Sequence, residues 1–160
     1  TIAIEIGLLL ALVLFMKRMS EVTHITVAKD QLDLSNEGEI YHEEEKLIVP
    51  QGVEVYEIDG PFFFGVANKF DECMKTIGDK PRIRIIRMRK VPFMDTTGLH
   101  NLESLYRLST KEKIQVILSG VNEQVRATLV KSSFARTIGE ENICSNIHEA
   151  LKRAEVCLKS

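Results

Sequence analysis

The spacing of apolar residues changes along the chain between the period of a strand and the period of a helix. Alternating or continuous apolar positions predict strands at residues 24–29, 53–58, 83–89 and 114–119. Apolar positions three and four residues apart predict helices near residues 63–77, 98–110, 122–132 and 146–158. Together these elements predict an α/β fold, in which helices pack on a mixed, mostly parallel sheet of four to five strands. The mostly apolar segment 114–119 is typical of a strand buried on both faces.

The first residues do not fit this pattern. An unbroken apolar run covers residues 7–16, continues back to residue 2 with only Glu5 interrupting it, and is followed at once by Lys17 and Arg18. A secretory signal would carry its basic residues before the apolar run. A run of about 15 residues is also shorter than the roughly 20 that cross a bilayer. We therefore favour the end of a transmembrane helix with a basic cytoplasmic exit, and a helix buried against the domain is the alternative.

This interpretation divides the chain into two parts. Residues 1–18 are the end of the membrane helix, and residues 19–160 form one cytoplasmic domain that contains a polar, acidic loop at residues 30–52. The 160 residues, 44% of them hydrophobic and 28% charged, are enough for one domain with a core but not for two. We accordingly expect the protein at the inner or plasma membrane, held there through residues 1–18.

Composition and spacing argue against several classes of site. Lys and Arg total 21 against 23 Asp and Glu, so no bulk charge indicates a nucleic-acid partner. The basic run from Lys80 to Lys90 is divided between the two faces of a strand and contains no aromatic residue for base stacking. We expect these charges at strand ends and in loops. The three cysteines are widely separated and show no metal-ligand spacing, so we expect neither a metal site nor a disulfide framework.

The loop Asp95-Thr96-Thr97-Gly98 is the segment with the best chemical case. It joins a predicted strand to a predicted helix, whose first amide groups need partners. Asp and Thr cap helix starts, and Gly lets the backbone approach a neighbour closely. Simple capping is one interpretation; the other is a hydroxyl presented for phosphorylation, or a helix start that binds an anion. No acid, base and nucleophile converge in the sequence, so we expect no catalytic residue and no enzyme.

The segment 91–99 (VPFMDTTGL) resembles the signature loop of STAS domains. That fold is shared by anti-sigma-factor antagonists and by the cytoplasmic tails of sulfate permease (SulP) anion transporters. Residues 53–64 resemble the second strand and the start of the first helix of the transporter tails, and residues 131–154 resemble their closing segment. Residues 1–21 resemble the last transmembrane helix and exit of the same transporters. The resemblance therefore covers essentially the whole chain, apart from residues 30–46.

The resemblance implies a STAS-type fold and a function as the C-terminal regulatory and interaction domain of a SulP-type sulfate or other anion transporter. A free-standing anti-sigma-factor antagonist is the alternative, which the apolar residues 1–18 disfavour. The implied partners are the transmembrane domain of the same transporter, a regulatory protein, and a second copy in the full-length homodimer; no cofactor is implied.

The resemblance also assigns roles within the loop. In the antagonist relatives the second hydroxyl residue is the phosphorylated one, and it matches Thr97, our candidate phosphorylation or regulatory site. The group Asp95, Thr96, Thr97 and Gly98 is the candidate loop for a weakly bound nucleotide, an anion or a partner protein.

Overall fold

The computed structural model describes residues 1–29, 31–32, 47–62 and 80–159 of the chain. Within these ranges the elements follow in the order α1 (Ile2–Val22), β1 (His24–Ala28), β2 (Gln31–Leu32), β3 (Leu47–Ile48), β4 (Val53–Asp59), β5 (Ile83–Lys90), α3 (Thr96–Lys111), β6 (Gln115–Ser119), α4 (Glu123–Lys131), α5 (Phe134–Ile138), the 3-10 helix η1 (Glu140–Asn142), β7 (Ile143–Cys144) and α6 (Ile147–Lys159).

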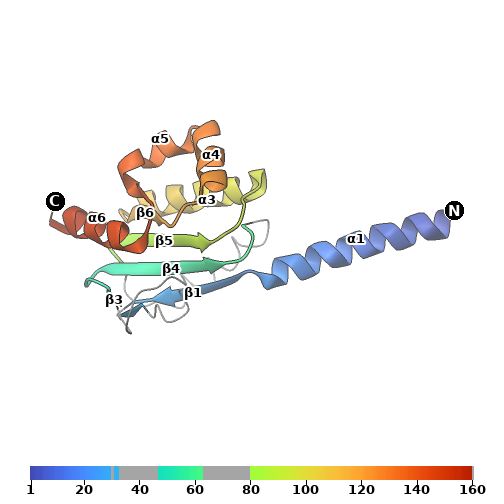
Figure 1. Cartoon of the computed structure of the whole chain (residues 1–160), viewed down its shortest axis with the longest axis horizontal. Helices are drawn as coiled ribbons and strands as arrows, with labels where there is room; N and C mark the ends of the chain where they lie inside the picture. The colour runs from blue at the N-terminus through green and yellow to red at the C-terminus, as the bar shows by residue number, and fades with distance from the viewer. Residues whose placement is uncertain (30, 33–46, 63–79, 160) are drawn as a thin grey trace.

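Five of the strands form one sheet in the order β1-β4-β5-β6-β7. β1 pairs antiparallel with β4, whereas β4, β5, β6 and β7 are parallel neighbours. Figure 1 shows the arrowheads of β4 and β5 pointing to the side from which α1 leaves the domain. This mixed, mostly parallel sheet with helices packed on it confirms the predicted fold class.

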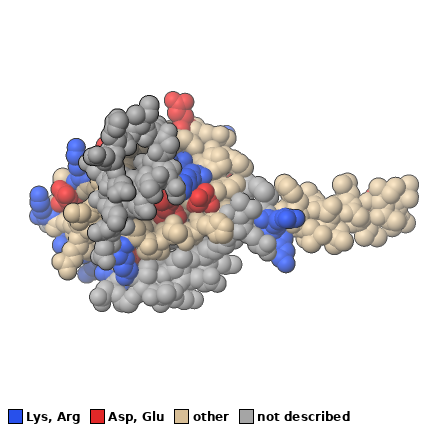
Figure 2. Space-filling model, turned by 60° about the horizontal axis from the view of Figure 1, so that its bottom comes forward, with Lys and Arg blue, Asp and Glu red and all other residues tan. Residues whose placement is uncertain are grey.

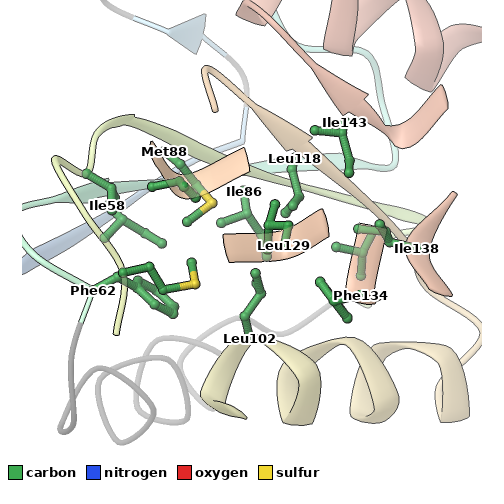
Figure 3. Packing of buried hydrophobic residues seen from close by; sticks show 14 of the residues in the cluster. Ile58, Phe62, Ile86, Met88, Leu102, Leu118, Leu129, Phe134, Ile138 and Ile143 are labelled. Carbon is green, nitrogen blue, oxygen red and sulfur yellow. The ribbon is translucent and has the colours of Figure 1, made fainter. Parts of the chain in front are cut away.

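Hydrophobic side chains cover both faces of the sheet, because successive residues of a strand point to opposite sides. On one face, Ile86 and Met88 of β5 pack with α3, α4 and α5; Figure 3 shows Leu102 of α3 pointing toward this cluster. On the other face, Ile83 and Ile85 pack against α6. β6 is buried along nearly its whole length, as its apolar sequence predicts.

The four predicted strands and the helices predicted near residues 98–110, 122–132 and 146–158 are confirmed. The helix predicted at residues 63–77 lies outside the described residues, as does most of the predicted acidic loop. The elements that the pattern did not predict are β2, β3, α5, η1 and β7. β2, β3, η1 and β7 contain two or three residues, too few for a spacing to recur, and the five residues of α5 make little more than one helical turn.

The basic run differs from the prediction in its central part. Arg84 and Arg87 are each only 3% exposed and lie within β5, instead of at a strand end or in a loop. The Arg84 guanidinium donates to the Ser109 hydroxyl at 2.6 Å, and the Arg87 guanidinium lies 3.4 Å from the Glu57 carboxylate. Arg87 is thus paired with a carboxylate, whereas Arg84 has a neutral hydrogen-bond acceptor and its buried Nε has none among the described residues. These contacts offset part of the cost of burying the two charges. Arg89 is exposed at the end of β5, as expected.

The helix α1 projects away from the domain (Figure 1), and its large apolar side chains are exposed. Leu8, for example, is 73% exposed and Phe15 is 62% exposed. This exposure differs from the alternative of a helix buried against the domain. Among the described residues, no helix combines the length and the apolar character needed to cross a membrane. The membrane-helix end at residues 1–18 therefore stays a prediction.

Candidate functional site

The candidate loop begins where the chain leaves β5 and turns into α3. Asp95 is the N-cap of α3 and has an extended backbone, with φ −90° and ψ 179°. Its Oδ1 atom accepts a hydrogen bond from the Gly98 amide at 2.6 Å. This bond satisfies one of the amides that a helix start leaves without a partner. Helix capping, the simpler of the two predicted roles, is therefore present in the loop.

Thr96 and Thr97 occupy the first two positions of α3, and both are exposed. Asp95 supplies the capping oxygen, so this cap uses neither threonine hydroxyl. The geometry therefore presents two hydroxyl groups at the positive end of a helix of 16 residues. A negative charge at this end is favoured by the helix dipole.

Gly98 is buried and packs directly on the backbone of Phe62. A Cβ atom at this position would overlap the Phe62 carbonyl oxygen and lie 2.9 Å from its carbonyl carbon. The Phe62 amide in turn donates to the Phe93 carbonyl at 3.3 Å, and Phe62 forms an isolated parallel bridge with Met94. The predicted close approach at Gly98 is therefore real, and its neighbour is the segment that follows β4.

Asn122, just before α4, holds the segment that leads from β5 to the loop, a role that sequence reasoning missed. Its Nδ2 group donates to the carbonyl oxygens of Val91 at 2.8 Å and Pro92 at 3.2 Å. Its Oδ1 atom accepts from the Val125 amide at 2.8 Å and so caps α4. An Asn before a helix predicts the cap. No signal in the sequence predicts the second contact, because it joins residues about 30 positions apart.

Charges lie near the strand ends beside the loop. The Lys90 ammonium is 3.4 Å from the carboxylates of both Glu57 and Asp59, and the Glu57 carboxylate raises the pKa of Lys90. Lys90 of β5 therefore forms ion pairs with two carboxylates of the neighbouring strand β4. Among the described residues, no group of three or more His, Cys, Asp or Glu side chains could hold a metal ion.

A second polar cluster lies on the α3 side of the sheet. The Tyr56 hydroxyl donates to Glu54 Oε2 at 2.9 Å, and Lys29 lies 3.1 Å from Glu54 Oε1. The Arg84 guanidinium lies over the Tyr56 ring, 5.3 Å from its centre, and donates to Ser109. Burial raises the pKa of Tyr56 well above its usual range. These contacts join β4, β5, α3 and the residue that follows β1, so the cluster supports the fold.

Comparison with known proteins gives a consistent result. The model of the STAS domain family matches residues 46–150. Sulfate transporter 1.1 of Arabidopsis thaliana is 31% identical over 165 residues, which cover 94% of this chain and 25% of that protein. The chain therefore spans about a quarter of the length of the curated relatives that it matches.

Solved structures agree with this match. A sulfate transporter family protein from Wolinella succinogenes is 38% identical, with a TM-score of 0.67, and the match covers 71% of this chain and 93% of that one. The STAS domain of a SulP transporter from Vibrio cholerae is 36% identical, with a TM-score of 0.62, over 74% of this chain and 91% of that one. An anti-sigma factor antagonist from Mycobacterium paratuberculosis is 19% identical with a TM-score of 0.54, over 82% of this chain and 95% of that one, a likeness of fold alone.

Proposed function

The chain belongs to the STAS domain family, among the STAS domains of SulP sulfate transporters, and we propose that it is the C-terminal cytoplasmic domain of a SulP-type anion transporter. In this proposal the domain is not an enzyme. It lies beneath the inner or plasma membrane, contacts the transmembrane domain of the same transporter, and regulates transport through the Asp95–Gly98 loop. A regulatory protein, a weakly bound nucleotide and a second copy of the full-length protein are its further proposed partners.

The observation that carries the proposal is α1. Its apolar side chains are exposed along residues 2–16, and exposed Lys17 and Arg18 follow. Figure 2 shows an uncharged helix surface with basic side chains gathered where it meets the domain. Exposed apolar surface of this extent is costly in water and favourable in lipid, and basic residues at its end are typical of the cytoplasmic side. A soluble antagonist has no use for such a helix.

The match to sulfate transporter 1.1 gives the same support. It covers 94% of the chain, and α1 contains 21 of the 160 residues, so part of α1 must lie within the match. The likeness to transporters thus continues beyond the globular domain into the helix that we place in the membrane.

The exposed Thr97 hydroxyl supports the regulatory part of the proposal. We expect that Thr97→Glu in the full-length protein changes sulfate uptake while the domain melts within a few degrees of the wild type. A carboxylate in the first turn of α3 gains about 0.3–1 kcal/mol from the helix dipole, partly offset by repulsion from Asp95. Uptake of labelled sulfate into membrane vesicles and thermal melting, measured on the same variant, test this expectation.

Gln124→Glu is the matched control, because Gln124 is exposed and also occupies the second position of its helix, α4. It adds the same carboxylate at an equivalent place outside the loop and should leave uptake unchanged. Equal uptake by wild type, Thr97→Glu and Gln124→Glu would show that the loop serves only to cap α3.

A further inference from the structure

We infer that residues 60–62 couple the exit of α1 to the Asp95–Gly98 loop, so that a change at the start of α3 alters the structure at Thr23, the residue between α1 and β1. The inference rests on three successive contacts, each made by backbone or by a buried side chain. The coupling is a property of the domain itself. Only its use as a signal to a membrane part rests on the proposed function.

The first contact fixes the end of α1. Thr23 follows α1 directly and is 1% exposed. Its hydroxyl donates to the Pro61 carbonyl at 2.9 Å. Breaking a hydrogen bond of a buried residue costs free energy, so a displacement of Pro61 is expected to displace Thr23 as well.

The second contact fixes the turn that carries Pro61. Gly60 has a φ of +114°, a conformation that residues with a side chain rarely adopt. A Cβ atom on Gly60 would lie 3.2 Å from both Cα and Oγ1 of Thr23, so the turn fits closely against that residue. The Gly60 amide also donates to the Lys90 carbonyl at 3.3 Å, which joins the turn to the end of β5.

The third contact joins the turn to the loop. The carbonyl of Phe62, one residue after Pro61, lies against Gly98 with no room for a single additional carbon atom. Phe62 is 1% exposed and is held by Phe93 and Met94, the two residues before Asp95. A displacement of the first turn of α3 therefore has to displace Phe62.

These three contacts leave little room for Thr23 and the start of α3 to move independently of each other. Close-packed interiors transmit displacement because they contain few voids that could absorb it. A charge or ligand that shifts the start of α3 should then also shift the Pro61 carbonyl, to which the Thr23 hydroxyl donates. This shift should change the direction in which α1 leaves the domain. By thermodynamic linkage, the coupling also acts in reverse, so a change at Thr23 must affect the loop.

Residue-resolved amide hydrogen exchange on the 160-residue chain in detergent micelles tests the coupling. Asp95→Ala removes the cap of α3 and frees its first turn. We expect the amides of Gly60 and Phe62 to exchange about fivefold faster in this variant, whereas amides at the centre of β6 stay unchanged. No transport is measured, so the result is independent of the proposed function.

Asn146→Ala is the matched control. The Asn146 side chain accepts from the Glu149 amide at 2.9 Å, so this variant also removes a helix cap, but at α6 on the opposite face of the sheet. It should leave Gly60 and Phe62 unchanged. Equal exchange at these two amides in both variants would overturn the inference, and so would a rise in Asp95→Ala that β6 shares equally.

The reverse direction provides a second, milder test. Thr23→Val keeps the shape of the side chain and removes its hydrogen bond to Pro61. We expect the Gly98 amide, which donates to Asp95, to exchange faster in this variant than in the wild type. An unchanged Gly98 amide would contradict the coupling even if Asp95→Ala disturbed the whole domain.

Discussion

Gly98 shows how one residue can serve both a helix and its surroundings. A glycine inside a helix normally costs about 1 kcal/mol relative to alanine. At Gly98 the missing side chain is required, because α3 begins against the Phe62 carbonyl. The DTTG sequence thus combines a capping Asp, two exposed hydroxyl groups and a packing Gly within four residues.

We predict that Gly98→Ala destabilises the domain by roughly 1–3 kcal/mol in spite of its better helix propensity, because the new methyl group forces the start of α3 away from Phe62. Urea unfolding of the chain in mild detergent measures this loss. Thr96→Ala lies in the same turn but is exposed, and should change stability by less than about 0.5 kcal/mol. Equal stability of the two variants would mean that the close approach at Gly98 is not maintained in solution.

The sequence was sufficient for the chemistry of this loop but not for its surroundings. Asp before a helix predicts a cap, and Gly after two Thr residues predicts a close approach, since both rules act over a few positions. Phe62, which packs on Gly98, lies 36 positions earlier in the chain, and Asn122 reaches back about 30 positions to Val91 and Pro92, just before the loop. Local patterns contain no information about such contacts.

At the scale of elements, period alone predicted the long strands and helices, because a core-facing stripe has to repeat over several residues. The strand β5 was predicted correctly, but the environment of its arginine side chains was not. Its length was expected, but not the burial of Arg84 and Arg87 inside it. Alternation predicts which face a residue occupies. It does not predict that a Ser or Glu on a neighbouring element will accept hydrogen bonds from an arginine on that face.

The contact between Arg84 and Ser109 is the polar link between β5 and α3. We predict that Ser109→Ala lowers the free energy of unfolding by about 1–3 kcal/mol, because it leaves a buried guanidinium without its acceptor at 2.6 Å. Urea unfolding of the chain, monitored by circular dichroism, measures the change.

Ser104→Ala on the same helix is the matched control. Ser104 also accepts from an arginine, Arg107, at 3.3 Å, but this pair is exposed to solvent. The loss there should stay below about 0.5 kcal/mol. If both serine variants unfold at the same urea concentration, the buried link contributes no more than a surface contact.

At the scale of the whole molecule, two surfaces of opposite character are joined at one edge of the sheet. The globular domain buries its apolar residues on both faces of the sheet, whereas α1 exposes them. The candidate loop follows β5 at the side from which α1 leaves (Figure 1). A domain attached to a membrane through α1 would therefore turn this loop, and any charge on Thr97, toward the membrane part that we propose as its partner.

Flotation of the 160-residue chain with liposomes tests whether α1 attaches the domain to a membrane. We expect the chain to float with the lipid even at high salt, where the electrostatic attraction of Lys17 and Arg18 to lipid headgroups is screened. The double variant Leu9→Glu with Leu12→Glu should remain at the bottom of the gradient, because each charge inside the bilayer costs about 3 kcal/mol. Both leucines are exposed, at 67% and 56%, so the variant should keep its fold. A wild-type chain that stays at the bottom as a monomer would contradict this attachment.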